Sequence, residues 1–117
     1  MYPFEKLIVW QDTRTLTKMI YSATQTFPKS EIFGLTSQIR RAAISVSSNL
    51  VEGSGRKFPN DQARFYEIAY ASLLELLNQL ILSVDLGFLP EEDLSKLREQ
   101  IEQISSKLSK LRSYNKN

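Results

Sequence analysis

Apolar side chains recur every three or four residues along most of the chain, the spacing that gathers them on one face of an α-helix. Four segments carry this pattern, and proline, glycine and asparagine lie between them. The last segment is the most regular, with apolar steps that follow an a/d heptad. Its apolar positions are Leu94, Leu97, Ile101, Ile104, Leu108 and Leu111. The pattern predicts helices over about residues 4–26, 31–53, 60–86 and 90–113.

The third segment has the widest apolar arc of the four. Ile68, Leu74, Ile81 and Leu82 lie beside its main stripe and broaden it. A helix that is apolar over most of its circumference is usually buried. We therefore expect the third helix to be the central and most buried one.

Residues at the ends of the segments favour the same boundaries. Pro28 should end the first helix, because the residue before a proline avoids the helical region. Ser30 and Asn60 are residue types that cap helix N-termini, so we expect them to cap the second and third helices. The run Gly53–Gly55 should end the second helix.

The four predicted helices have matched lengths of roughly 22 residues, or about 33 Å each at the standard rise. Helices of equal length joined by short connections pack well as antiparallel neighbours. We therefore expect an all-α fold in which residues 1–117 form a single domain, an antiparallel up-down-up-down four-helix bundle.

Composition narrows the range of functions. The chain has 117 residues, 42% of them apolar, which suits one globular domain with one core. It contains no cysteine and no histidine, which excludes disulfides, thiolate sites, a Ser-His-Asp triad and histidine metal ligands. We expect no catalytic residues, no metal site and no cofactor, and hence a protein that is not an enzyme.

The sequence carries no sign of a membrane or secretory segment. No apolar run approaches the ~20 residues that a membrane span needs. Residues 1–6 lack a basic region followed by an apolar one, so they do not resemble a signal peptide. We expect a cytoplasmic protein that does not contact a membrane.

The small net charge of +2 conceals a segregation along the chain. Residues 1–64 carry +4, residues 65–105 carry −6 and residues 106–117 carry +4. This distribution suits self-assembly between unlike surfaces, or a basic face for a polyanion. An ordinary solvated surface is the simpler interpretation.

Basic residues on and after the second helix are the best candidates for binding chemistry. Arginine offers a planar fork of donors that matches the oxygens of a phosphate. We predict a nucleic-acid-binding surface with the candidate residues Arg40, Arg41, Arg56, Lys57, Arg64, Lys6 and Arg14. The alternative is a set of solvated charges in surface ion pairs, each worth less than about 1 kcal/mol.

A polar stripe runs beside the apolar stripe of the second predicted helix. Serine and asparagine are weak helix formers, so their presence there favours a close contact over plain exposure. The stripe contains Gln38, Arg41, Ser45, Asn49, Glu52 and Arg56. We predict that this face contacts a partner or another copy, the alternative being exposure to solvent.

Two weaker interpretations concern carboxylates and the tryptophan. Glu52, Glu67 and Glu75 could meet inside a bundle to bind a metal or act as acid and base, although pairing with arginines is more common. Trp10 could stack on nucleic-acid bases. It lies on the apolar stripe of the first helix, so we expect it to pack in the core.

The order and spacing of several motifs resemble one protein family. The motifs are Phe4-Glu5-Lys6-Leu7-x-Val9-Trp10-Gln11, Phe27-Pro28-x-x-Glu31-x-Phe33-Gly34-Leu35-x-x-Gln38-x-Arg40-Arg41-Ala42-Ala43, Ser45-Val46-x-x-Asn49-Leu50-x-Glu52-Gly53 and Ser72-x-x-Glu75-Leu76. Together they span essentially the whole chain and closely resemble the 23S rRNA intervening-sequence protein family, also called the four-helix-bundle protein family. Leu50-Val51 departs from the usual Ile-Ala, which is a change of packing size only.

The resemblance implies a four-helix bundle that assembles into a ring-like homopentamer. It also implies a relationship to the accessory protein of diversity-generating retroelements, a basic pentamer that partners a reverse transcriptase and nucleic acid. The family signature includes the positions of Gln38, Asn49, Glu52 and Glu75, and with Ser45 these are our candidate contact residues. For most members no biochemical activity is established.

Two hypotheses about function follow. The leading one is a non-enzymatic, homopentameric adaptor that binds structured RNA or DNA through a basic surface. The alternative is an assembly scaffold for a protein partner, with no nucleic acid involved.

Overall fold

The computed structural model describes residues 1–116, which form four long helices and two short 3₁₀ helices, with no β-strand among them. Their order is η1 (Pro3–Lys6), α1 (Ile8–Thr24), η2 (Lys29–Glu31), α2 (Leu35–Ser54), α3 (Pro59–Asp85) and α4 (Glu91–Lys116). The prediction of an all-α fold with four helices is therefore confirmed over these residues. Asn117, which belongs to the predicted domain, lies outside the described residues.

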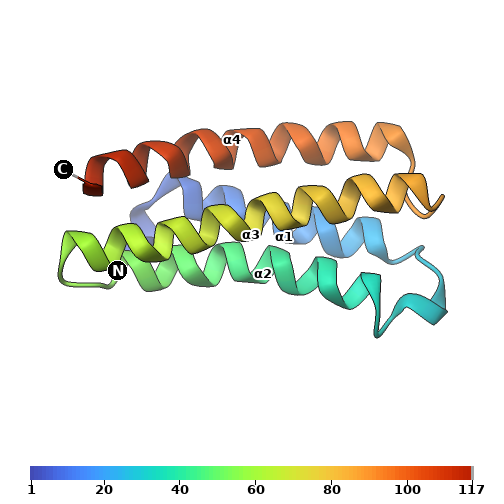
Figure 1. Cartoon of the computed structure of the whole chain (residues 1–117), viewed down its shortest axis with the longest axis horizontal. Coiled ribbons are helices and arrows are strands. Elements are labelled where there is room, and N and C mark those ends of the chain that lie inside the picture. The colour runs from blue at the N-terminus through green and yellow to red at the C-terminus, as the bar shows by residue number, and fades with distance from the viewer. Residues whose placement is uncertain (117) are drawn as a thin grey trace.

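The four long helices lie side by side along the 43 Å axis of the molecule (Figure 1). α1 contacts α2 and α4, and α3 also contacts α2 and α4, so each helix has two neighbours. The α2–α3 turn lies at one end of the molecule, together with the start of α1 and the last turns of α4 (Figure 1). The α1–α2 connection and the α3–α4 turn lie at the other end.

All four helices contribute to one apolar core. Its fully buried members recur at helical spacing, as the sequence pattern indicates, and burial of each large side chain contributes about 1.5–3 kcal/mol. They are Leu16, Ile20, Ile39, Val46, Leu50, Leu73, Leu76, Leu80, Ile104 and Leu108.

The first predicted helix is interrupted at Leu7. This residue has extended backbone angles (φ −81°, ψ 125°), so it separates η1 from α1. The change of direction lets Leu7 pack against the core and brings the ring of Phe4 edge-on to Trp10, with centroids 4.9 Å apart. Side-chain packing therefore overrides the helical periodicity that predicts one segment over residues 4–26.

The predicted helix caps Ser30 and Asn60 are wrong. Ser30 lies within η2, and α2 begins only at Leu35, whose backbone N–H donates to the carboxylate of Glu31 at 3.2 Å. α3 begins one residue before Asn60, at Pro59, because the ring of a proline presets the backbone angle of a first helical residue.

α2 and α3 approach closely at Gly53. A Cβ atom at this position would lie 2.7 Å from Cε1 of the buried Tyr66 ring and 3.1 Å from Cβ of Phe65. α2 continues through Gly53 and ends after Ser54, with Gly55 as its C-cap. The helix therefore ends within the run Gly53–Gly55, as the sequence predicts, and Gly53 itself serves the contact between the two helices.

The first and last helices are joined by polar contacts centred on Asp12. The ammonium group of Lys107 on α4 donates to the Asp12 carboxylate, and Gln100 Nε2 donates to the Asp12 backbone carbonyl at 3.0 Å. α4 is also tied to α3, because Arg112 Nε donates to Glu67 Oε1 at 3.1 Å. These contacts hold the last helix against two neighbours.

The prediction that α3 is the most buried helix is wrong for the residues that broaden its apolar arc. Ile68, Leu74 and Leu82 are exposed, because α3 contacts only α2 and α4 and its outer side has no neighbour in the chain. By length and composition alone, α3 could cross a membrane, although charged and polar residues interrupt its apolar positions. A core helix of a soluble protein passes the same test, so this is weak evidence for a membrane.

Replacement of Gly53 by alanine should destabilise the fold. Overpacking against the Tyr66 ring costs about 1–3 kcal/mol, while alanine in a helix gains back at most about 1 kcal/mol. We expect a net fall in the free energy of unfolding in urea of up to about 2 kcal/mol. Gly55→Ala is the matched control, because its Cβ would lie no closer than 3.7 Å to any atom. An equal loss in both variants would contradict this interpretation of Gly53.

Candidate nucleic-acid interface

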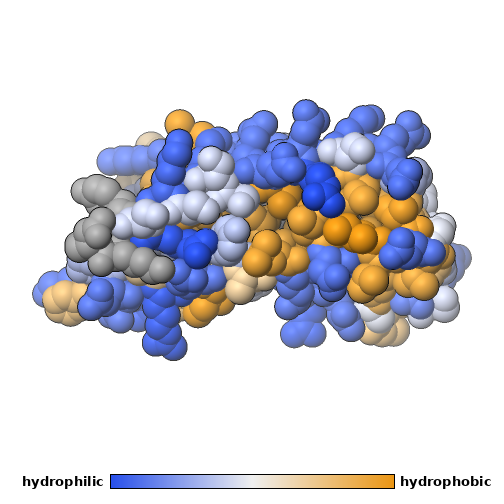
Figure 2. Space-filling view, turned by 45° about the horizontal axis from the view of Figure 1, so that its top comes forward, coloured by the Kyte–Doolittle hydropathy of each residue, from blue (hydrophilic) through white to orange (hydrophobic). Residues whose placement is uncertain are grey.

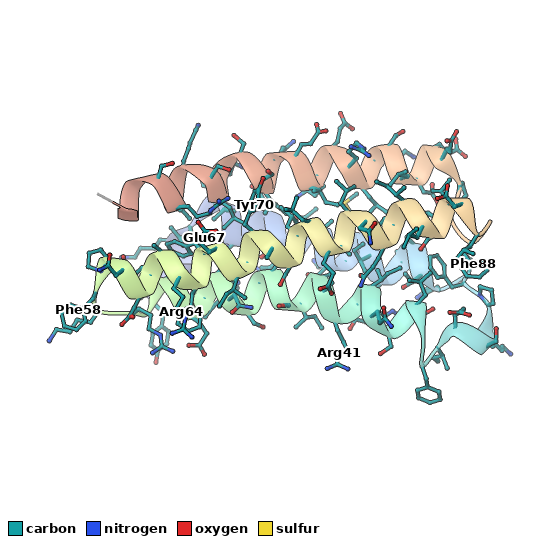
Figure 3. All side chains as sticks on the ribbon, in the orientation of Figure 1. Arg41, Phe58, Arg64, Glu67, Tyr70 and Phe88 are labelled. Atoms are coloured by element: carbon teal, nitrogen blue, oxygen red, sulfur yellow. The ribbon has the colours of Figure 1, made fainter. Side chains whose placement is uncertain are left out.

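Exposed cations gather at the turn between α2 and α3. Arg56 and Lys57 lie in the turn itself, and Arg64 projects from the second turn of α3 (Figure 3). Phe58, between these cations in sequence, is 60% exposed. We call Arg56, Lys57, Phe58 and Arg64 the basic turn. Its members come from adjacent parts of the sequence, so a short turn suffices to bring them together.

Phe65 supports two of the cations of the basic turn. The guanidinium carbon of Arg56 lies 4.4 Å from the centre of the Phe65 ring, and that of Arg64 lies 5.9 Å from it. An aromatic face attracts a cation and restricts where it lies. The Lys57 ammonium lies 5.6 Å from the ring of Phe58 in the same way. Two guanidinium groups are thus held over a single ring.

Most of the donors of these side chains remain available for a ligand. Arg56 Nη2 lies 3.2 Å from Glu52 Oε2, but both side chains are exposed, so this pair contributes little. Arg56 is also held through its backbone, because its carbonyl accepts a hydrogen bond from Gln62 Nε2 at 2.9 Å. The backbone of the turn is therefore fixed, while most guanidinium N–H groups remain available. This arrangement suits the oxygens of a phosphate.

The ring next to Phe65 on α3 stays neutral. Burial raises the pKa of the Tyr66 phenol above its usual value of 10.0. The charge of the basic turn is therefore not offset by a phenolate at ordinary pH.

Arg40 is engaged within the chain. Its Nε donates to Thr24 Oγ1 at 2.9 Å and its Nη2 to the Tyr21 carbonyl at 3.4 Å, and its guanidinium lies 4.5 Å from the centre of the Tyr21 ring. Arg40 thus fastens α2 to the end of α1. It lies 16 residues before Arg56, about 24 Å along the helix axis, so it is remote from the basic turn.

Arg41, although next in sequence, projects away from the helices into solvent (Figure 3). It is about as far from the basic turn as Arg40 along the same helix. The predicted cluster of Arg40, Arg41, Arg56, Lys57 and Arg64 is therefore split, and only its last three members lie together.

Lys6 and Arg14 lie on the side of the molecule formed by α1 and η1. Lys6 is exposed at the end of η1, which contacts both α1 and α2. Arg14 donates to Gln11 Oε1 at 3.0 Å, and its guanidinium lies 4.9 Å from the centre of the Trp10 ring. They are separate from the basic turn in sequence but lie toward the same end of the molecule.

Trp10 is only half-buried and lines a groove between α1 and α2. The expectation of core packing is thus half right, because one part of the ring packs against the core and another faces the groove. The groove has a volume of about 330 Å³, and its lining combines cations with hydroxyls: Trp10, Arg14, Thr17, Lys18, Ile44, Ser47 and Ser48.

The polar stripe of α2 divides into two parts. Ser45 Oγ lies 2.8 Å from Ser72 Oγ on α3, and Asn49 Nδ2 donates to the Ser45 carbonyl at 2.9 Å. Ser45 therefore joins α2 to α3 of the same chain, whereas Asn49 bonds to Ser45 within α2. Gln38 and Glu52 remain exposed on the outer side.

The three glutamates of the weaker metal hypothesis have separate partners. Glu52 pairs with Arg56, Glu67 accepts from Arg112, and the exposed Glu75 accepts from Gln79 Nε2 at 3.3 Å. Among residues 1–116, no group of three or more acidic side chains is arranged to hold a metal ion. Their pairing follows the commoner arrangement, in which carboxylates meet cations or amides.

Phe58 and Phe65 are the site residues that the sequence interpretation missed. Phe65 belongs to the apolar stripe of α3, which predicts core packing only, and Phe58 was not singled out. The run Arg56-Lys57-Phe58 and the pair Arg64-Phe65 each place an aromatic side chain next to a cation in sequence. That adjacency is the signal that could have identified them.

Arg40 and Arg41 should differ in their effect on stability. Arg40→Ala removes two hydrogen bonds and a cation–π contact. The shorter hydrogen bond is worth about 1 kcal/mol and the cation–π contact about 0.5–1 kcal/mol, so unfolding should cost about 1–2 kcal/mol less. Arg41→Ala should change the free energy of unfolding by less than about 0.5 kcal/mol. Urea unfolding measures both. Equal effects would show that Arg40 does not fasten α2 to α1.

A comparison of the chain with models of known protein families finds a match over residues 5–110. The family model described as 23S rRNA-intervening sequence protein matches this range, which includes the basic turn, the whole of α2 and α3 and most of α4. No curated protein matches the chain.

Proposed function

The chain belongs to the 23S rRNA-intervening sequence protein family, and we propose that it is a non-enzymatic, homo-oligomeric helical protein that binds structured RNA or DNA. The ligand is held by its phosphate backbone at the basic turn. The family name describes a class of proteins and does not by itself supply a ligand. The proposal therefore depends on the geometry of the turn.

One observation carries the proposal: Arg56 and Arg64 are both held over the Phe65 ring with most of their donors free. Ordering long side chains in advance reduces what binding loses in conformational entropy. Guanidinium groups contact phosphate oxygens in any sequence, and such contacts position a nucleic acid without reading its bases. Little sequence preference is therefore expected.

Self-assembly would strengthen this binding. We propose a homopentamer, as the family resemblance implies, in which five copies multiply the formal charge of +2 and repeat the basic turn. Contacts that are weak singly then act together on one polyanion. Gln38, Glu52 and Glu75 are exposed, so each is accessible to another copy.

The same proposal covers the topology of the helices, a role without catalysis and the location of the protein in the cell. We propose that the four helices form one antiparallel up-down-up-down bundle, supported by the pairwise helix contacts and the short α2–α3 and α3–α4 turns. The absence of histidine and cysteine from the sequence supports a role without catalysis. A cytoplasmic setting, with no membrane partner, completes the proposal.

A second candidate function is an assembly scaffold for a protein partner. It is favoured by the exposed apolar side chains of α3, which include Ile68, Leu74 and Leu82. Apolar side chains gathered on one outer face often mark a protein contact. Under this alternative, the partner would remain bound after nuclease treatment.

Charge reversal at the basic turn tests nucleic-acid binding. Arg56→Glu combined with Lys57→Glu should weaken binding to a fluorescent RNA hairpin and to duplex DNA. The slope of log affinity against log salt should fall by about 2 for each basic turn engaged, since each phosphate contact contributes about 0.9. Fluorescence anisotropy at several salt concentrations measures both quantities.

The control is Lys29→Glu combined with Lys96→Glu, which makes the same charge change with exposed lysines outside the basic turn. Its binding should change much less. An equal loss in both variants would indicate attraction to the overall charge only. Binding that is absent at low salt, or insensitive to salt, would contradict the proposed function.

Light scattering in solution tests the proposed assembly. We expect a mass of five times the 13.5 kDa chain mass. The number five is the one that the family resemblance implies. Assembly itself is expected because the exposed apolar face of α3 has no neighbour within the described chain, and burial in another copy removes it from water. A monomer at micromolar concentration would contradict the oligomer, while leaving the basic turn to be tested separately.

A further inference from the structure

The break in the helix at Leu7 opens an apolar groove between α1 and α4. The groove occupies about 550 Å³, and its floor and edges are formed by Lys6, Leu7, Ile8, Val9, Lys107, Lys110 and Leu111. Ile8 is 70% exposed although its side chain is fully apolar. We call this feature the lysine-edged groove. An apolar surface of this kind, bordered by cations, suits an apolar ligand that carries negative charge.

Two of the three lysines are available to a ligand. The Lys107 ammonium is bound to the Asp12 carboxylate, which holds it at the groove wall. Lys6 and Lys110 are exposed, and no ion pair involves either of them within residues 1–116. The groove therefore presents unpaired positive charge beside apolar surface.

The opposite end of the molecule carries a surface with the complementary character. Leu82 and Leu86, one turn apart at the end of α3, are 44% and 60% exposed, and Asp85 lies exposed between them. Glu91 and Glu92 in the first turn of α4 are exposed nearby in sequence. We call these five residues the acidic leucine edge. Figure 2 shows apolar side chains gathered at this end of the face formed by α3 and α4.

The turn that joins the two helices fixes the acidic leucine edge. The backbone N–H groups of Phe88 and Leu89 both donate to the Ser83 carbonyl, at 2.9 and 3.3 Å. Gly87 has φ +78°, a left-handed conformation that glycine adopts without strain. The two leucines are therefore presented on a defined backbone, which lowers the entropy lost when they dock.

We infer that the acidic leucine edge of one copy docks in the lysine-edged groove of the next. Leu82 and Leu86 would cover the apolar floor, and Asp85, Glu91 and Glu92 would face Lys6 and Lys110. The two surfaces lie toward opposite ends of a molecule 43 Å long, so they cannot meet within one chain. The inference rests on the proposed self-assembly and names its contact.

This contact is heterologous, because two different surfaces of the same chain meet. A heterologous contact repeats from copy to copy, and it closes into a ring when the rotation between neighbours allows. It would also explain the segregation of charge along the chain, in which the acidic stretch of residues 65–105 is flanked by basic ones. Two surfaces of the same charge would repel each other, whereas the acidic leucine edge and the lysine-edged groove attract each other.

Two charge-reversed variants test the inference. The groove variant carries Ile8→Glu and Lys110→Glu, and the edge variant carries Asp85→Lys and Leu86→Lys. Ile8 is the first residue of α1 and Asp85 the last of α3, so an acid at one and a base at the other suit the helix dipoles. Circular dichroism checks that both variants keep their helices. Phe58→Lys is the control for loss of an apolar side chain, since Phe58 and Leu86 are equally exposed.

Each variant alone should be monomeric by light scattering, whereas Phe58→Lys should keep the mass of the wild-type protein. An equimolar mixture should form a species of twice the 13.5 kDa chain mass and nothing larger. The reason is that the intact edge of the groove variant can dock in the intact groove of the edge variant, and no further surface remains.

Three results would overturn the inference. If both variants keep the wild-type mass, the proposed oligomer stands and uses another contact. If the variants are monomeric but their mixture also stays monomeric, the two surfaces do not bind each other. If the wild-type protein is itself a monomer, the proposed assembly fails and this contact fails with it.

Discussion

The close contact between α2 and α3 positions the basic turn. Gly53 lets Phe65 and Tyr66 of α3 approach the α2 backbone, and Ser45 and Ser72 share a hydrogen bond farther along the same pair of helices. Since Phe65 carries the guanidinium groups of Arg56 and Arg64, its position against α2 decides where those charges lie. A larger side chain at Gly53 would move the platform of the basic turn as well as the helices.

Helical periodicity is enough to predict the four helices, because a core shared by packed helices imposes a repeat that the sequence displays directly. It fails at Leu7, where an aromatic contact between Phe4 and Trp10 bends the chain without any proline or glycine to signal it. Helical periodicity also fails for the outer side of α3, where apolar positions that it predicts to be buried are exposed. Periodicity identifies apolar positions, but it does not tell whether the helix that covers them belongs to the same chain or to another.

The site could be predicted in part for a similar reason. Arg56 and Lys57 are neighbours in sequence and stay neighbours in space. Arg40 resembles them by residue type, yet its partners Tyr21 and Thr24 lie on another helix, and only the tertiary packing of α1 on α2 engages it. The roles of Phe65 and Trp10 depend on which part of each ring the neighbouring helix leaves uncovered. The sequence alone does not contain that information.

The contacts at Asp12 have a consequence for the order of folding. The α2–α3 and α3–α4 pairs are joined by short turns and α1–α2 by a ten-residue connection, so these pairs form between neighbours in the chain. The contact of α1 with α4 joins residues 88 and 95 positions apart, from Asp12 to Gln100 and to Lys107. Closing so long a loop costs more chain entropy than closing a turn. The seam between the first and last helices should therefore be the last to form during folding, and the first to open when the native state fluctuates.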